Sequence, residues 1–320
     1  MSVWPAESVS KRVRVIIDND FSGDPDGLLQ LAHHLLSPTV DVRAVIGTHL
    51  REGDVWNPGN DVELAVEEAN KIVELCGQTG QYPVLEGAQG YMKDVRTPLD
   101  SAGIDFIIQE AMRDDTDVPL YMACGASLSE IASAYLKEPR IAERITLVWI
   151  GGHEHEGLAE TAPGAPDLEY NLHQDVIAGQ VVFNHSNLKL WQVPRDSYRS
   201  CLYSRAELLV DLVNAGPLGL HLATALGKVS AMVESMGMSA GEAYALGDSP
   251  LVLLTALQSA FEPDTASSSW TNVPCPTLLS NGLYEANPSG RSIRVYGLLD
   301  NRLMFGDMIA KLKLQAAGLR

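Results

Sequence analysis

The stretch that constrains the fold most is Val13–Gly27, which reads VRVIIDNDFSGDPDG. Its first five residues are apolar and β-branched apart from Arg14, and they predict a short buried strand. Acidic residues follow at once, and a helical pattern of apolar residues spaced three and four apart begins at Leu28. A strand that leads through an acidic turn into a helix is a typical opening unit of an α/β fold.

The rest of the chain repeats this alternation of strands and helices. Strands are predicted at residues 40–48, 119–124, 145–150 and 188–193, with a strand pair within 277–299. Helices are predicted at residues 61–76 and 175–184, over most of 205–260, and from about Asn301. This pattern predicts one domain over residues 1–320, an α/β fold with a mostly parallel central sheet and helices on both faces. The Gly-, Pro- and Glu-rich loop 153–168 is interpreted as an active-site insertion, because the alternation continues beyond it.

Composition limits the classes of partner. The chain has 23 Lys+Arg against 41 Asp+Glu, a net charge of −18. This surplus makes nucleic acids and anionic membranes poor partners and favours neutral or cationic small molecules. The start, Met1–Lys11, has no apolar stretch of signal-peptide length, and no run of about 18 apolar residues predicts a membrane helix. The widely spaced cysteines are typical of reduced thiols in a cytoplasmic protein: Cys76, Cys124, Cys201 and Cys275.

Four carboxylates stand within nine residues at the end of the first strand: Asp18, Asp20, Asp24 and Asp26. Ligands of open α/β sheets bind beyond the carboxyl ends of strands, which is where this cluster lies. Carboxylates this close repel one another unless they are solvated, hydrogen-bonded or bound to a cation, and oxygen ligands of this density suit Ca²⁺ or Mg²⁺. A structural explanation also exists for part of the cluster, because Asp24 before Pro25 is an ordinary helix N-cap and Asp26 falls in the first turn.

The Asp-x-Asp pair alone is also compatible with a Mg²⁺-dependent phosphatase of the haloacid-dehalogenase type. In that alternative Asp18 is the nucleophile and Asp20 the acid/base, with Lys228 as the phosphate-binding lysine. The loop at Asp248 would then bind Mg²⁺. This alternative leaves the acids at positions 24 and 26 unexplained.

Further motifs follow the acidic cluster in a fixed order. An apolar segment ends in Gly-Gly at Leu147–Gly152, Glu-Tyr-Asn stands at Glu169–Asn171, and Gly247–Leu251 reads GDSPL. The ordered set resembles the nucleoside hydrolase family of the inosine-uridine-preferring type, whose signature after the first strand is Asp-x-Asp-Pro-Gly-x-Asp-Asp. Here Phe21 replaces the proline, and Pro25 stands as an extra residue between the last two acids.

This resemblance implies a doubly wound fold and a Ca²⁺-dependent hydrolysis of the N-glycosidic bond of a ribonucleoside. Asp20 would bind Ca²⁺ and act as general base on a bound water, with Asp18 only orienting its neighbours. Three further protein groups would bind the metal: Asp26, Asp248 and a main-chain carbonyl near Cys124 or Gly125. Three side chains would hold the ribose: Asp24, Glu169 and Asn171. The resemblance also implies a homodimer or homotetramer that takes a free nucleoside or a related N-ribosyl compound.

The chain departs from the family pattern where the leaving base is expected. The family has His before the metal-binding Asp, and this chain has Gly247, which has no proton to donate. Four other residues are candidates for contacting the base: Trp56, Tyr244, Trp270 and His221. Insertions at Pro25 and Ser249 are expected to move the acids that follow or precede them. A non-catalytic protein that binds ribose or a nucleoside is therefore also an alternative.

Overall fold

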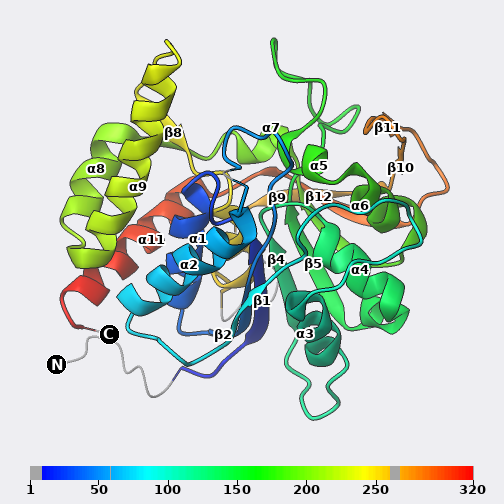
Figure 1. Cartoon of the computed structure of the whole chain (residues 1–320), viewed down its shortest axis with the longest axis horizontal. Helices are drawn as coiled ribbons and strands as arrows, with labels where there is room; N and C mark the ends of the chain where they lie inside the picture. Colours follow the sequence, from blue (N-terminus) through cyan, green and yellow to red (C-terminus); the bar gives the residue numbers. More distant parts are fainter. Residues whose placement is uncertain (1–8, 58, 260–266, 320) are drawn as a thin grey trace.

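An eight-stranded sheet forms the centre of the described part of the molecule, in the order β3-β2-β1-β4-β5-β6-β12-β9 (Figure 1). The computed structural model describes residues 9–57, 59–259 and 267–319, so most of the predicted polar start lies outside the described residues. The strands of this sheet are β1 (Val13–Asn19), β2 (Val40–Gly47), β3 (Val84–Glu86), β4 (Leu120–Cys124), β5 (Ile145–Ile150), β6 (Lys189–Val193), β9 (Ser269–Pro274) and β12 (Ser292–Leu298). Neighbouring strands pair in parallel, except that β9 runs antiparallel to β12.

Helices pack on both faces of the sheet, as the alternating pattern predicts. One face is covered by α1 (Asp26–Leu35), α2 (Asp61–Leu75), α8 (Arg205–Val213), α9 (Gly216–Ser235), α10 (Pro250–Thr255) and α11 (Asn301–Ala316). The other is covered by α3 (Ala102–Ala111), α4 (Ser129–Lys137), α6 (Val176–Gln180) and a π-helical turn (Val181–His185). Strand β1 is buried along its whole length. Val15 and Ile17 pack on the face covered by α1 and α2, and Ile16 packs on the face covered by α3 and α4. A strand buried on both faces explains the unbroken apolar run in the sequence.

The carboxyl ends of the central strands meet at one edge of the sheet. Asp18 of β1 pairs with Cys124 of β4, and Cys124 pairs with Trp149 of β5. The segments that follow these three strands therefore lie side by side. Two short helices, α5 (Tyr170–Gln174) and α7 (Arg195–Tyr198), lie at this end, at the top of Figure 1. The antiparallel pair β7 (Leu202–Ser204) and β8 (Ala243–Ala245) lies at the same end.

The sequence predictions agree with many of these elements but do not include β3, β9 and α3, and two predicted features differ in detail. The predicted strand pair in 277–299 is split, because β10 (Thr277–Leu278) pairs with β11 (Tyr284–Glu285) while β12 joins the main sheet. Helix α1 has Pro25 at its N-cap, one residue later than predicted. Asp24 still accepts the N–H of Asp26 through Oδ1 at 3.2 Å, as a capping residue does.

Two predictions from composition can be compared with the described residues. Within them, no helix is both long and apolar enough to cross a lipid bilayer. All four cysteine side chains are buried. The remaining short element, a 3₁₀ helix (Pro139–Glu143), follows α4 and carries no predicted site residue.

Candidate active site

Carboxylates from the two ends of the chain meet beyond β1. Asp26 at the start of α1 accepts the N–H of Asp248 through Oδ2 at 3.1 Å, and α10 begins two residues after Asp248. The side chain of Asp248 is held separately, because Asn19 Nδ2 donates to Asp248 Oδ2 at 2.8 Å. The insertions in the sequence have therefore not separated the N-terminal acids from Asp248.

Burial and mutual repulsion dominate the electrostatics of this cluster. Burial raises the pKa of Asp20 well above its usual range, and the charges of Asp248, Asp24 and Asp54 raise it further. Burial, followed by the charges of Asp248 and Asp24, likewise raises the pKa of Asp26. Burial raises the pKa of Asp248 to about 7 although the hydrogen bond from Asn19 lowers it. In the described part of the chain no Lys or Arg forms an ion pair with these acids, so a bound cation would relieve the repulsion.

The donor chemistry of the cluster fits a hard divalent cation. The three predicted side-chain ligands offer carboxylate oxygens only, the type that Ca²⁺ and Mg²⁺ prefer. Asp20 is 7% exposed, while Asp24 and Asp26 are partly exposed. Within the described residues no three His, Cys, Asp or Glu side chains form a compact metal-binding group. The acids are therefore neighbours in the structure without being drawn together around one point.

The thiol of Cys124 takes no part in this cluster. It is fully buried, donates to the carbonyl of Ser127 at 3.1 Å, and lies 3.7 Å from Asp18 Oδ2. Only the main chain at this position can face a ligand. Of the two carbonyls named from the sequence, that of Gly125 already accepts a hydrogen bond from Asn171 Nδ2 at 3.0 Å.

Asp18 is sealed inside the protein. It has no solvent exposure, and its Oδ1 has no hydrogen-bond partner. Burial, followed by the charge of Glu130, raises its pKa well above the usual range. A carboxyl group that substrate cannot reach is no phosphatase nucleophile, and Lys228 lies on the exposed side of α9. The phosphatase alternative is therefore not supported.

The Glu169 carboxylate is surrounded by protein donors. It caps α5, accepting the N–H of Asn171 on Oε1 at 3.1 Å and the N–H of Leu172 on Oε2 at 2.9 Å. Gly152 N–H donates to Oε2 at 2.7 Å and the Tyr198 hydroxyl to Oε1 at 2.8 Å. Burial raises the pKa of Glu169, although these hydrogen bonds lower it. Instead of lying on a solvated loop edge, Glu169 is 1% exposed.

Asn171 is also fixed, but one of its polar atoms remains available. Its Nδ2 donates to the carbonyls of Gly125 at 3.0 Å and Ile150 at 2.8 Å, which ties α5 to the ends of β4 and β5. Both amide hydrogens are used by these bonds, so Oδ1 is the atom left to accept a hydrogen bond from a ligand.

The loop after β2 adds site residues that the sequence motifs did not indicate. Asp54 is one of the charges that raise the pKa of Asp20, and burial followed by the charges of Asp20 and Asp54 raises the pKa of Tyr170. Gln174 Nε2 donates to Asp54 Oδ2 at 3.1 Å and holds the loop against α5. The only sequence signal for Asp54 is its place after a strand that ends at the same edge as β1. Two phenols of the site donate to acids, Tyr198 to Glu169 and Tyr244 to Asp24.

The residues proposed for the base contact separate into two groups. Tyr244 lies in the site, where its hydroxyl donates to Asp24 Oδ1 at 2.8 Å, and the main-chain N–H of Trp56 donates to Asp54 Oδ1 at 3.0 Å. The other two lie elsewhere: His221 of α9 is 3.4 Å from Glu68 of α2, and Trp270 is on the edge strand β9 under Arg294. These contacts of Trp270 and His221 therefore do not join either residue to the acid cluster.

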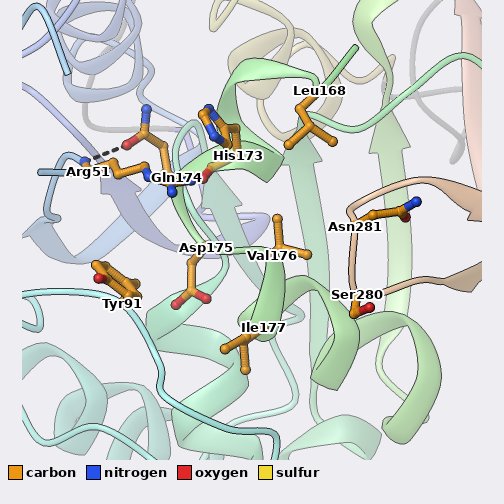
Figure 2. A pocket seen from close by; sticks show the side chains of 10 residues that line it. All are labelled: Arg51, Tyr91, Leu168, His173, Gln174, Asp175, Val176, Ile177, Ser280 and Asn281. Atoms are coloured by element: carbon orange, nitrogen blue, oxygen red, sulfur yellow. Dashed lines mark hydrogen bonds between the residues drawn. The ribbon is translucent and has the colours of Figure 1, made fainter. Parts of the chain in front are cut away.

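A pocket of about 360 Å³ lies beside α5, and its lining side chains are labelled in Figure 2. The acids of the cluster do not line it. Arg51 and Gln174 meet at its rim, where the Arg51 N–H donates to Gln174 Oε1 at 2.6 Å. Its one carboxylate, Asp175, is occupied by Met92 N–H at 2.8 Å and the Ser129 hydroxyl at 2.6 Å. This pocket is therefore separate from the acid cluster.

Comparisons with known proteins agree with the order of motifs and with the fold. The family model for inosine-uridine preferring nucleoside hydrolase matches residues 15–277. A purine-preferring ribonucleoside hydrolase from Gardnerella vaginalis has a similar structure, with a TM-score of 0.67 and 17% identity over 95% of this chain and 99% of that one. An inosine-uridine preferring nucleoside hydrolase from Bacillus anthracis gives 0.65 and 14% over 94% and 99%. No curated protein matched the sequence. At these identities the structures show the fold alone.

Proposed function

The chain belongs to the inosine-uridine preferring nucleoside hydrolase family and is a hydrolase that acts on nucleosides. From this premise we propose that it cleaves the N-glycosidic bond of a ribonucleoside to give free base and ribose. One observation carries the proposal. Acids from segments more than 200 residues apart, Asp26 and Asp248, are in hydrogen-bond contact beside Asp20 at the carboxyl edge of a parallel sheet. Ligands of α/β sheets bind at this edge.

Asp20 is proposed as the general base. A water oxygen forms the new bond to the anomeric carbon, and the water proton passes to the Asp20 carboxylate. The electron pair of the breaking C–N bond leaves with the nucleobase. The position of Asp20 supports this role, because it follows β1 and is nearly buried among other acids. A carboxylate in such surroundings holds a proton more readily than one in water.

Calcium is the proposed cation. Its protein ligands would be the carboxylates of Asp20, Asp26 and Asp248 and the main-chain carbonyl of Cys124, an all-oxygen set suited to Ca²⁺. When bound, the cation would polarise the attacking water and offset the charge of the acids. Asn19 Nδ2 donates to Asp248 Oδ2 at 2.8 Å and so fixes one oxygen of this proposed ligand.

Two sides of the site are proposed to hold the sugar. Asp24 stands on one side, with Oδ1 held by Tyr244 and by the N–H of Asp26. Asn171 and Glu169 form the opposite side, at the start of α5. Gly247 supplies no acid to the leaving base, so we propose that the base leaves without proton donation from that position.

A panel of purine and pyrimidine ribonucleosides tests this function. Release of base and ribose is measured with Ca²⁺, with chelator, and after Ca²⁺ is restored. We expect turnover of at least one ribonucleoside that chelator abolishes and Ca²⁺ restores. A folded protein that releases base from no member of the panel contradicts the proposal, and turnover that is indifferent to chelator contradicts its calcium part.

We further propose that residues 1–320 act as one domain and assemble as a homodimer or homotetramer in the cytoplasm. Assembly is supported by apolar side chains that α8 and α9 expose together. Four of them are between 49% and 60% exposed: Leu209, Val210, Val213 and Leu220. Exposed apolar side chains on two neighbouring helices are typical of contact surfaces.

A further inference from the structure

The acceptor capacity of Glu169 is already used. A carboxylate offers about four acceptor positions, and Glu169 receives two donors on each oxygen, all between 2.7 and 3.1 Å. A sugar hydroxyl can therefore bond to Glu169 only if one of these donors leaves.

Three of the four donors are main-chain groups that the fold holds in place. Two belong to the first turn of α5. The third is the N–H of Gly152, whose φ of +85° favours glycine and whose Cβ would collide with Gln192 and Tyr284. The Tyr198 hydroxyl is the one side-chain donor among the four. It is therefore the donor that can move away and free an acceptor position of Glu169.

Tyr198 reaches from Glu169 to the acid cluster. A Cβ at position 247 would lie 3.3 Å from Tyr198 Cδ2 and 3.3 Å from Asp26 Oδ2. The tyrosine ring therefore packs over Gly247, next to a proposed metal ligand, while its hydroxyl lies on Glu169. The glycine leaves the space that the ring needs, since any side chain there would be tighter than an ordinary contact.

We propose that Tyr198 makes the sugar contact of this site, with its O–H donating to Glu169 and its phenolic oxygen accepting a hydrogen bond from a hydroxyl of the ribose. This inference rests on the proposed function and assigns the contact expected of Glu169 to the phenol. Glu169 then serves as the positioning residue, which fixes the direction of the phenol O–H. Burial, followed by the charge of Glu169, raises the pKa of Tyr198, so the phenol keeps the proton that it donates.

The competing arrangement is that substrate displaces Tyr198 and bonds directly to Glu169. The two arrangements give opposite results for Tyr198→Phe, which keeps the ring over Gly247 and removes the oxygen. If the phenol binds the sugar, the variant loses affinity. If the phenol blocks Glu169, the variant gains affinity, because substrate no longer competes with it.

The experiment compares wild type with Tyr198→Phe on the best nucleoside of the panel, with Tyr203→Phe as matched control. Tyr203 makes the same kind of bond to Asp211, at 2.9 Å, between β7 and α8. We expect KM to rise about tenfold in Tyr198→Phe, with kcat changed less than KM and an unfolding temperature close to that of wild type. Tyr203→Phe should keep the wild-type KM.

Deoxynucleosides identify the partner hydroxyl and separate a sugar contact from a loss of packing. For the 2′-, 3′- or 5′-deoxy compound that lacks the partner, wild type and Tyr198→Phe should have equal KM. A lower or unchanged KM in Tyr198→Phe, or a penalty that persists with all three deoxy compounds, overturns the inference.

A further arm keeps this inference separate from the proposed function. If wild type cleaves no nucleoside, the function fails, and calorimetry with free ribose then compares the two proteins directly. Weaker ribose binding by Tyr198→Phe supports the contact. Equal or absent binding in both proteins overturns it.

Discussion

The guanidinium of Arg195 holds the Glu154 carboxylate through two parallel hydrogen bonds, with Nε 2.9 Å from Oε1 and Nη2 2.8 Å from Oε2. Both side chains are nearly buried, at 9% and 3% exposure. Arg195 Nη1 also donates to the carbonyl of Pro166 at 2.7 Å. One side chain of α7 therefore ties both ends of the 153–168 loop to the helix that carries Tyr198.

Replacing Arg195 by Met should destabilise the protein strongly. The change leaves the Glu154 charge nearly buried without its partner, which typically costs about 3–5 kcal/mol. The free energy of unfolding from urea titration measures it. Arg140→Met is the control, because its bidentate pair with Glu138 leaves the arginine side chain 72% exposed and such pairs contribute about 0–1 kcal/mol. Equal losses in the two variants contradict the prediction.

The ion pair between Arg195 and Glu154 should make the free energy of unfolding depend on pH. Burial raises the pKa of Glu154, but the hydrogen bonds and charge of Arg195 lower it by more, so that in the folded protein it lies below 4.5. The stability from this depressed pKa is present above pH 4.5 and is lost as pH falls through the lower folded value. Unfolding free energies of wild type and Glu154→Gln, measured from neutral to acid pH, should converge at low pH. A constant difference between them contradicts the prediction.

Asp20→Asn should remove activity and leave the fold intact. The amide cannot take the water proton, so kcat should fall by about 10²- to 10⁴-fold. In chelator the unfolding temperature should be no lower than that of wild type, because one of several repelling carboxylates is gone. Asp105→Asn, an exposed acid paired with Lys137, should keep full activity. Retained turnover in Asp20→Asn rules out Asp20 as the base.

Calcium should stabilise the folded protein. Binding to the native state at a free concentration one hundred times Kd contributes about 2.7 kcal/mol, seen as a higher unfolding temperature that chelator reverses. Asp26→Asn should weaken this response, because its carboxylate is a proposed ligand. The exposed acid Asp115 provides the control, since Asp115→Asn should respond as wild type does. A wild-type response in Asp26→Asn would remove Asp26 from the ligand set.

Charges on the exposed apolar face of α8 should prevent assembly. Leu209→Glu combined with Val213→Glu changes two side chains that are 56% and 49% exposed, so a monomer should fold normally. Sedimentation velocity should show a multimer for wild type and a monomer for the double variant. A monomeric wild type contradicts assembly, and an unchanged multimer places the interface elsewhere.

Local patterns predicted the elements of this fold well. The strand at residues 145–150 agrees residue for residue with β5, and the helix 61–76 differs from α2 by one residue. Parallel strands buried on both faces leave unbroken apolar runs in the sequence, and amphipathic helices leave a clear period. The acids at positions 20, 24 and 26 follow β1, as the sequence predicted, whereas Asp248 was indicated by the motif at Gly247–Leu251.

The contacts between distant side chains could not be read in the same way. Tyr198 lies in a short helix without any motif, and only the folded chain brings its hydroxyl to Glu169, 29 residues away. Asp54 stands in a loop whose path depends on Gln174, 120 residues further along. The acceptor positions of Glu169 are filled by four donors from three segments of the chain. A local sequence pattern cannot show such an arrangement.

Because the site residues are widely separated in the sequence, the ribosome makes them at different times. Asn19 and Asp248, which touch in the folded protein, are 229 residues apart. At about 5–20 residues per second on the ribosome, roughly 10–50 s pass between their syntheses. During that interval β1 and its acids can collapse with the first strands without facing Asp248. The share of the charge repulsion that comes from Asp248 therefore arises only after residue 248 has been made, so the early folding steps proceed without that share.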